Sequence, residues 1–158
     1  MTAPRIIGLA GRAGSGKSTA ARLLCEYHAF VEVALGDPST RALASLLNRR
    51  RAIADDLWLI MARRHIDQLT AQAARLHIAG IVISDLRYPD EADMVRQLGG
   101  TVWHIVRAAP PVAAHCSEAG ITPQPGDRTL DNTGTLDQLE TSIEHLLYGP
   151  FALYGDAS

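Results

Sequence analysis

The sequence predicts an α/β fold of three layers, in which helices cover both faces of a five-stranded parallel sheet, with a small lid. Short apolar runs alternate with segments of helical periodicity, and this alternation implies a parallel sheet buried on both sides. The first apolar run leads through a glycine-rich turn into a helix. The 158 residues, 47% hydrophobic and 20% charged, suit one globular domain spanning residues 1–158.

The first part of the chain is expected to contain two strands, each followed by a helix. An apolar run predicts a strand at residues 5–10, and the segment after the glycine turn predicts a helix at 17–28. A second strand is expected at 30–35. The Gly-Asp-Pro step at 36–38 then begins a helix, since aspartate caps helices and proline suits their first position. An arginine-rich stretch at 48–51 interrupts that helix.

The middle of the chain continues the same alternation. Apolar residues recur at helical spacing from 55 to 78, which predicts one long helix or two in tandem. A fully apolar strand is expected at 81–84. A helix at 89–98 should stop at the glycine pair that follows it, and a fourth strand is expected at 101–106.

The last part of the chain begins with an irregular stretch. Four prolines and two glycines between residues 108 and 126 predict an irregular lobe, and we expect a lid over about 107–126. A short fifth strand is expected at 128–131. The final helix, at 135–147, should begin at a capping box formed by Thr135 and Gln138.

The strongest motif is the glycine-rich turn, which reads G-x-x-x-x-G-K-S over residues 11–18. Strand, glycine loop and helix together are the context that a phosphate-binding loop requires. Glycines let backbone N–H groups approach phosphate oxygens, and the helix N-terminus adds a partial positive charge. The alternative is an ordinary glycine turn before a helix. The residues expected to bind the phosphates of a nucleotide are Gly11, Arg12, Ala13, Gly14, Ser15, Gly16, Lys17, Ser18 and Thr19.

Two oxygen-bearing side chains are candidates for holding Mg²⁺ beside those phosphates. Lys17 is expected to reach the β and γ phosphates, and the hydroxyl of Ser18 to hold the metal. Asp85 ends the third strand, at the edge where ligands bind in such sheets, and is expected to hold Mg²⁺ directly or through water. The alternative for Asp85 is a turn or helix-capping role.

Three further residues are candidates for phosphoryl-transfer chemistry. Asp37 follows the second strand, where a carboxylate can orient the attacking group, although helix capping explains it equally. Arg87 offers a bidentate fork for phosphate, and its alternative is a solvated loop arginine. Arg107 ends the fourth strand and could stabilise transferring charge, with Arg12 and Arg128 as rivals.

The overall composition argues against several other classes of protein. A net charge of −2 gives no general attraction to nucleic acid or to an anionic membrane, so neither is expected as a partner. No apolar stretch approaches the roughly 20 residues of a membrane span. The chain leads directly into its first strand, so no signal peptide is expected. Two cysteines make no disulfide framework, which favours a reducing cytoplasm.

Six motifs in order resemble those of the phage-type deoxynucleoside monophosphate kinases, a P-loop branch of the nucleoside monophosphate kinases. The aspartate–arginine string and the H-x-S-E step are the specific ones. The motifs are the glycine loop at 11–18, Gly-Asp-Pro at 36–38, S-D-L-R-Y-P-D-E-A at 84–92, G-G-T-V with Arg107, H-x-S-E at 115–118, and Asp127 with N-T-G-T-L at 132–136.

This resemblance implies a P-loop kinase fold that transfers the γ-phosphoryl group of ATP, with Mg²⁺, to a deoxynucleoside 5′-monophosphate. It implies that Lys17 and Ser18 contact ATP and metal, and that Arg87 and Asp37 surround the acceptor. Arg107 and residues 115–118 would belong to a lid. By the same resemblance, Asn132, Gly134 and Thr135 would lie near the adenine of ATP. We expect a monomer or homodimer in the cytoplasm, which is the host cytoplasm if a phage encodes it.

The chain departs from the resembled family around the acceptor site. Between Leu47 and Asp55 it has an arginine-rich connection in place of a longer segment with a glycine–threonine–glutamate step. Gly36, Tyr88 and Asp90 replace the commoner alanine, phenylalanine and asparagine. Two alternatives therefore stay open: a P-loop kinase for another small acceptor such as dephospho-coenzyme A, and a nucleotide-binding module with reduced catalysis.

Overall fold

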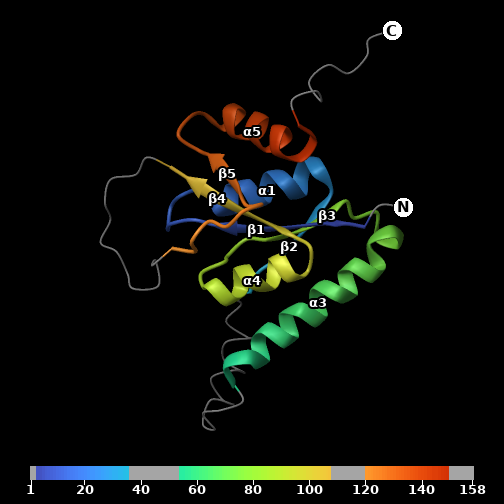
Figure 1. The fold of residues 1–158 in the computed structure, drawn as a ribbon. Coiled ribbons are helices and arrows are strands. Elements are labelled where there is room, and N and C mark those ends of the chain that lie inside the picture. Colours follow the sequence, from blue (N-terminus) through green and yellow to red (C-terminus); the bar gives the residue numbers. More distant parts are fainter. Residues whose placement is uncertain (1–2, 36–53, 108–119, 150–158) are drawn as a thin grey trace.

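The computed structural model describes residues 3–35, 54–107 and 120–149, and its centre is a five-stranded sheet in the order β2-β3-β1-β4-β5 (Figure 1). All four strand pairs are parallel. The central strand β1 pairs with β3 through Arg5 and Gly80, and with β4 through Ile7 and Thr101. The strands are β1 (Arg5–Ala10), β2 (Phe30–Val33), β3 (Gly80–Ile83), β4 (Thr101–Val106) and β5 (Arg128–Asp131).

Helices cover both faces of this sheet, which confirms the three-layer prediction (Figure 1). α1 and α5 contact each other on one face, while α3 and α4 contact each other on the other face. The helices of the described ranges are α1 (Lys17–His28), α3 (Ala54–Leu76), α4 (Pro89–Gln97) and α5 (Leu136–Tyr148). None of them combines the length and apolar character needed to cross a membrane.

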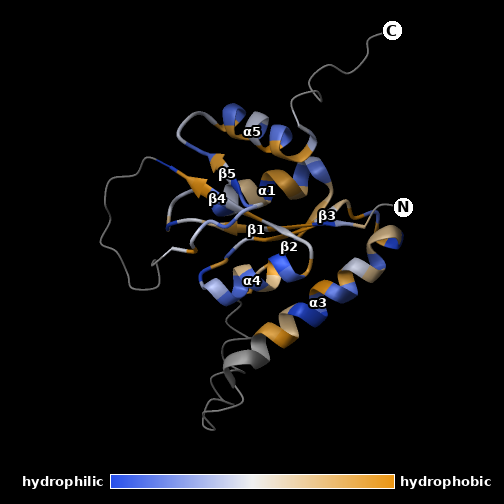
Figure 2. Cartoon of the chain, viewed as in Figure 1, coloured by the Kyte–Doolittle hydropathy of each residue, from blue (hydrophilic) through white to orange (hydrophobic). Residues whose placement is uncertain are grey.

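The alternation of side chains along β1 divides the core between the two faces. Ile7 and Leu9 belong to the hydrophobic cluster beneath α1 and α5, and Ile6 and Ala10 to the cluster beneath α3 and α4. The central strands β1 and β3 are predominantly hydrophobic, whereas the edge strand β5 has one hydrophobic residue and the helices are mixed in character (Figure 2). Burial on both faces is why β1 and β3 read as continuous apolar runs in the sequence.

The predicted elements are confirmed with small shifts of their ends. The second strand ends at Val33, two residues earlier than expected, and the long helical segment is one helix, α3. Thr135 caps α5 as predicted, since its Oγ1 accepts a hydrogen bond from Gln138 N at 3.3 Å. The helix expected after residue 38 and the interruption at 48–51 lie outside the described residues.

The parallel topology gathers several predicted site residues at one edge of the sheet. The carboxyl ends of β1, β3, β4 and β5 are followed by the phosphate loop, Asp85, Arg107 and Asn132 respectively. Ligands of parallel α/β sheets bind at this edge. The fold therefore places the candidate site there.

Candidate functional site

The glycine loop between β1 and α1 has a backbone that only glycine adopts readily. Gly11 and Gly16 have φ angles of +154° and +102°, in the region that disfavours side chains. A Cβ atom at Gly11 would lie 2.7 Å from Ser15 Oγ and 2.8 Å from the Ile105 carbonyl oxygen. The loop closes on itself through a 3.1 Å hydrogen bond from Ser15 N to Arg12 O. The motif thus forms a tight loop, packed against the end of β4.

The N-terminus of α1 is suited to receive an anion. Its N-cap residue is Gly16, which supplies no side-chain oxygen, and the first turn contains no acidic residue. The orphan N–H groups of a helix start carry a partial positive charge that acidic residues or caps usually offset. Here that charge is left to an external group, as a phosphate site requires.

Lys17 lies over the loop that precedes it. Its Nζ donates hydrogen bonds to the carbonyl oxygens of Gly11, at 2.6 Å, and of Arg12, at 2.9 Å. Lys17 is also the only lysine in the chain, since every other cationic side chain apart from histidine is an arginine. The ammonium group is therefore held at the loop where phosphates are predicted to bind.

Asn132 connects the end of β5 to the same loop. Its Nδ2 donates a 2.7 Å hydrogen bond to Ser15 O, and its backbone N–H donates to Val106 O at 2.8 Å. A Cβ atom at Gly16 would clash with Asn132 Nδ2. The structure thus places Asn132 against the phosphate loop. Contact between Asn132 and adenine stays a prediction.

Gly134 and Thr135 follow Asn132 and form the start of α5. Gln138 Oε1 accepts a 2.9 Å hydrogen bond from Thr135 N and lies so close to Gly134 that a side chain there would collide with it. These contacts show that both residues belong to the cap at the start of α5. Their place near adenine stays a prediction.

The candidate metal ligands are found at the expected edge. Asp85 directly follows Ser84 after β3, is half-buried, and its Oδ1 accepts a 2.7 Å hydrogen bond from Leu35 N. Ser18 lies exposed in the first turn of α1. The described residues contain no group of three or more His, Cys, Asp or Glu side chains that could hold a metal. The two oxygen donors fit Mg²⁺, which commonly takes one or two protein ligands together with phosphates and water.

The turn from Asp85 to Tyr88 is anchored to the rest of the protein. Leu86 is buried in the core and lies so close to Gly8 that a Cβ there would be 2.5 Å from Leu86 Cδ1. The backbone N–H groups of Arg87 and Tyr88 both donate to Glu91 Oε2, the latter at 3.1 Å. The exposed Arg87 side chain therefore extends from a fixed backbone.

Glu91 is a buried carboxylate that the sequence interpretation missed. It is 4% exposed, and burial raises its pKa, while the hydrogen bonds from the Arg87 and Tyr88 N–H groups partly offset that rise. Its place as the third residue of α4 is a capping-box position. That spacing after Tyr88 is the signal that could have revealed it.

The three arginines considered for stabilising the transferring charge lie in different parts of the fold. Arg107 follows β4 at the edge of the phosphate loop and is exposed, and Arg12 lies exposed in the loop itself. Arg128 begins β5 and so lies at the opposite edge, which removes it as a rival. Asp37 and residues 115–118 lie outside the described residues.

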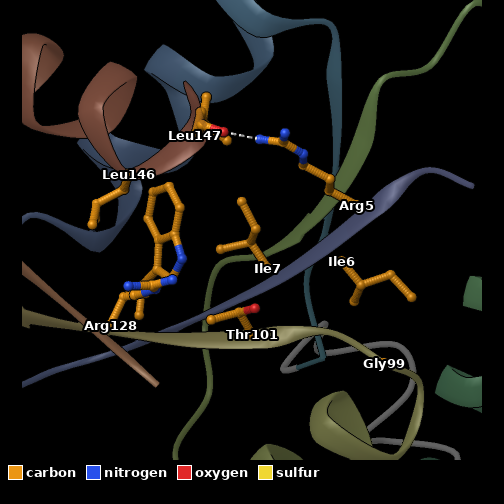
Figure 3. A pocket seen from close by; sticks show the side chains of 9 residues that line it. Arg5, Ile6, Ile7, Gly99, Thr101, Arg128, Leu146 and Leu147 are labelled. Atoms are coloured by element: carbon orange, nitrogen blue, oxygen red, sulfur yellow. Dashed lines mark hydrogen bonds between the residues drawn. The ribbon is translucent and has the colours of Figure 1, made fainter. Parts of the chain in front are cut away.

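A cavity of about 250 Å³ lies at that opposite edge, between the amino ends of the strands and the end of α5 (Figure 3). Arg5 lines it, donates a hydrogen bond to Leu147 O, and lies 5.6 Å from the ring centre of Tyr148. These contacts cap the C-terminus of α5, where a cation is favourable. The cavity is remote from the phosphate loop and is not part of the candidate site.

A second charged cluster anchors the segment before β5. Asp127 accepts hydrogen bonds from Arg96 Nη2 at 2.7 Å, from His104 Nε2 at 2.9 Å and from Gln124 N at 2.9 Å. Burial alone would raise the pKa of Asp127, but these bonds outweigh it and lower that pKa well below its usual range. Ile121 is also buried against the sheet. Ile121 and Asp127 are therefore anchored to the rest of the fold, while residues 108–119 lie outside the described part and the lid stays a prediction.

Solved structures of P-loop kinases share this fold. An unliganded sugar kinase from Janibacter sp. is 16% identical, with a TM-score of 0.54 over 97% of this chain and 99% of that one. The Mycobacterium tuberculosis APS kinase CysC, in complex with AMPPNP and APS, is 15% identical, with a TM-score of 0.56 over 93% of this chain and 99% of that one. Fold and phosphate loop together show that this chain has the P-loop kinase fold.

The sequence pattern of a narrower family matches residues 50–143, well over half of the chain, and is described as deoxynucleotide monophosphate kinase. The chain belongs to the deoxynucleotide monophosphate kinase family, a family of phosphotransferases.

Individual relatives carry the same description. The Escherichia phage RB69 deoxynucleotide monophosphate kinase is 36% identical over 67 residues, which is 42% of this chain and 28% of that protein. A protein of Acanthamoeba polyphaga mimivirus, provisionally given the same name, is 28% identical over 87% of this chain and 93% of its own length. The aligned part of this chain thus spans less than a third of the phage enzyme.

Proposed function

We propose that this protein transfers the γ-phosphoryl group of ATP to the 5′-phosphate of a deoxynucleoside monophosphate. An oxygen of the acceptor phosphate forms the new bond to the γ phosphorus. The bond from that phosphorus to the β-γ bridging oxygen breaks, and ADP leaves. The observation that carries the proposal is a complete phosphate loop, at the ligand-binding edge of the sheet, in a chain of this kinase family.

The proposed roles are supported by the position of each residue at the phosphate-loop edge of the sheet. The loop N–H groups and the start of α1 bind the phosphates, and Lys17 exchanges its carbonyl partners for phosphate oxygens. Ser18 and Asp85 would hold Mg²⁺, which neutralises phosphate charge when bound. Arg87 binds the acceptor phosphate from the turn after β3.

The remaining site assignments rest on the resemblance of motifs in the sequence. Asp37 and Arg107 complete the surroundings of the acceptor and of the transferring group. Asn132, Gly134 and Thr135 border the adenine. We further propose that the enzyme acts in the cytoplasm as a monomer or homodimer, without a nucleic acid or membrane partner.

The test is ADP formation from Mg-ATP with a panel of acceptors. The panel contains dTMP, dGMP, dCMP, dAMP, their ribose counterparts and dephospho-coenzyme A, with Lys17→Ala as the control protein. Turnover that depends on a deoxynucleoside monophosphate and falls by on the order of 10² or more in the control supports the proposal.

The other outcomes of the same assay are equally informative. Turnover with dephospho-coenzyme A alone would assign a different acceptor to the same loop chemistry. Binding of ATP without turnover on any acceptor would identify a nucleotide-binding module and overturn the proposal.

A further inference from the structure

The turn that carries Arg87 is held at three successive points. Asp85 is tied to the end of β2 through Leu35 N, and Leu86 is 2% exposed in the core. The third point is the Glu91 carboxylate, which accepts the N–H groups of Arg87 and Tyr88 through one oxygen, Oε2. Of these three contacts among the described residues, the one made by Glu91 is the only one that holds Arg87 itself.

Because Glu91 is buried, its hydrogen bonds hold the turn more strongly than the same bonds would at the protein surface. With 4% of Glu91 exposed, water has little access to its carboxylate. Hydrogen bonds to an ionised group are stronger than neutral ones, and a buried N–H that loses its acceptor is costly. Removing the carboxylate would therefore let the Arg87 backbone move.

We propose that Glu91 is a positioning residue, which holds the backbone of Arg87 from behind so that its guanidinium meets the phosphate of the acceptor nucleotide. This inference rests on the proposed function. It adds a residue on α4 that contributes to use of the acceptor through Arg87.

A purely structural helix cap would behave differently. Asp90 lies in the same first turn of α4, and its Oδ1 accepts a 3.0 Å hydrogen bond from Glu91 N, yet it contacts neither Arg87 N nor Tyr88 N through any bond that the structure shows. If Glu91 only stabilised the helix start, changes at the two acidic residues would act alike. If it positions Arg87, only the change at Glu91 alters use of the acceptor.

The experiment compares Glu91→Gln, Glu91→Ala and Asp90→Asn with the wild-type enzyme in steady-state kinetics, varying ATP and acceptor separately. The glutamine keeps the shape and one oxygen acceptor, so we expect the acceptor KM to rise about threefold, and about tenfold for the alanine. The KM for ATP should stay unchanged in both, and Asp90→Asn should match the wild type. Equal changes in both Michaelis constants, or an equal effect of Asp90→Asn, would overturn the proposal.

A double-mutant cycle with Arg87→Ala tests whether the effect passes through that residue. Adding Glu91→Gln to Arg87→Ala should leave the acceptor KM where Arg87→Ala put it, because the positioned group is gone. Independent, additive effects would overturn the inference while leaving the kinase intact.

Folding and the proposed function have separate readouts. The folding of each variant is checked by chemical denaturation. If the Glu91→Gln protein does not fold, Glu91→Asp replaces it, because aspartate keeps the charge on a shorter side chain. The Glu91→Asp protein should show the same selective rise in acceptor KM. A wild-type protein without turnover on any acceptor would overturn both the kinase and the role of Glu91.

Discussion

Single charged side chains hold together segments that are distant in the sequence. Asp127 joins α4 to β4 and to the segment before β5, through Arg96, His104 and Gln124 N. Its carboxylate is 5% exposed, so its partners have little water to replace it. Such a group is costly to remove, because the half-buried Arg96 and His104 then lose a charged acceptor that water replaces poorly.

Asp127→Asn should destabilise the protein by about 1–3 kcal/mol at pH 7. The folded-state pKa of Asp127 lies below its ordinary value of 3.8, so its contribution is present above that value and is lost as the pH falls through and below it. The stability difference between wild type and variant should therefore shrink at pH 3, as measured by urea denaturation. The exposed Asp67 in α3 provides the control, Asp67→Asn, and a pH-independent difference would contradict the assignment.

Lys17 offers a direct probe of phosphate binding, because no other lysine competes with it. An amine-directed acylating reagent should modify Lys17, and Mg-ATP at ten times its Kd should slow that reaction about tenfold, in proportion to the free protein. Mass spectrometry of the Lys17 peptide measures the rate, with the N-terminal amine as internal reference. Equal rates with and without ATP would place Lys17 outside the nucleotide site.

Individual elements are completed by contacts at their ends. Ala29 is the C-cap of α1; its φ of 54° and ψ of 37° lie in the left-handed region, and its N–H donates to Leu24 O. The phosphate loop before α1 is supported by Asn132, 117 residues away in the sequence. One end of this helix is therefore strained, and the other depends on a distant loop.

Ala29→Gly should stabilise the protein by about 0.5–1 kcal/mol, because glycine adopts the left-handed conformation without steric cost. The same substitution at the exposed Ala71, inside α3, should destabilise by about 1 kcal/mol, because glycine disfavours a helix interior. Urea denaturation of the two variants measures both effects. Destabilisation in both would show that Ala29 is not strained.

Asn132→Ala should raise the KM for ATP by about three- to tenfold and leave the acceptor KM unchanged, since it removes one hydrogen bond to the phosphate loop. Separate titrations of ATP and acceptor measure the two constants. Thr133→Ala, at the exposed neighbouring position, is the matched control and should behave like the wild type. A rise in the acceptor KM alone would place Asn132 in another part of the site.

At the scale of the whole molecule, the parallel sheet brings the segments of the candidate site together. The phosphate loop, Asp85 and Asn132 follow three different strands, and they meet at one edge because all strands point the same way. A ligand that contacts several of these segments stabilises the folded state as a unit, since the unfolded chain cannot bind it.

Mg-ATP at 100 times its Kd should therefore stabilise the protein by about 2.7 kcal/mol. For a chain of this size the midpoint of thermal unfolding should rise by roughly 5–10 °C. Thermal scans with EDTA in place of Mg²⁺, and with Lys17→Ala, should show a clearly smaller rise. An identical rise in the presence of EDTA would argue against the metal site at Ser18 and Asp85.

The sequence alone determined the features that depend on neighbouring residues. The alternation of apolar runs and helical segments predicted the layers, and residues 11–18 predicted a phosphate loop, which the structure shows as a tight glycine turn before α1. The capping of α5 by Thr135 was likewise predicted, from the position of Gln138 three residues later. Such features are encoded locally, since periodicity, glycine positions and caps act over a few residues.

The tertiary structure decided the features that depend on contacts between distant segments. It separated Arg128 from the phosphate loop, because a parallel strand begins at the edge opposite to the one where it ends. It brought Asn132 to Ser15 and buried Glu91 beneath the turn of Arg87. No local pattern specifies which strands become neighbours, and the strand order sets which side chains meet at the site.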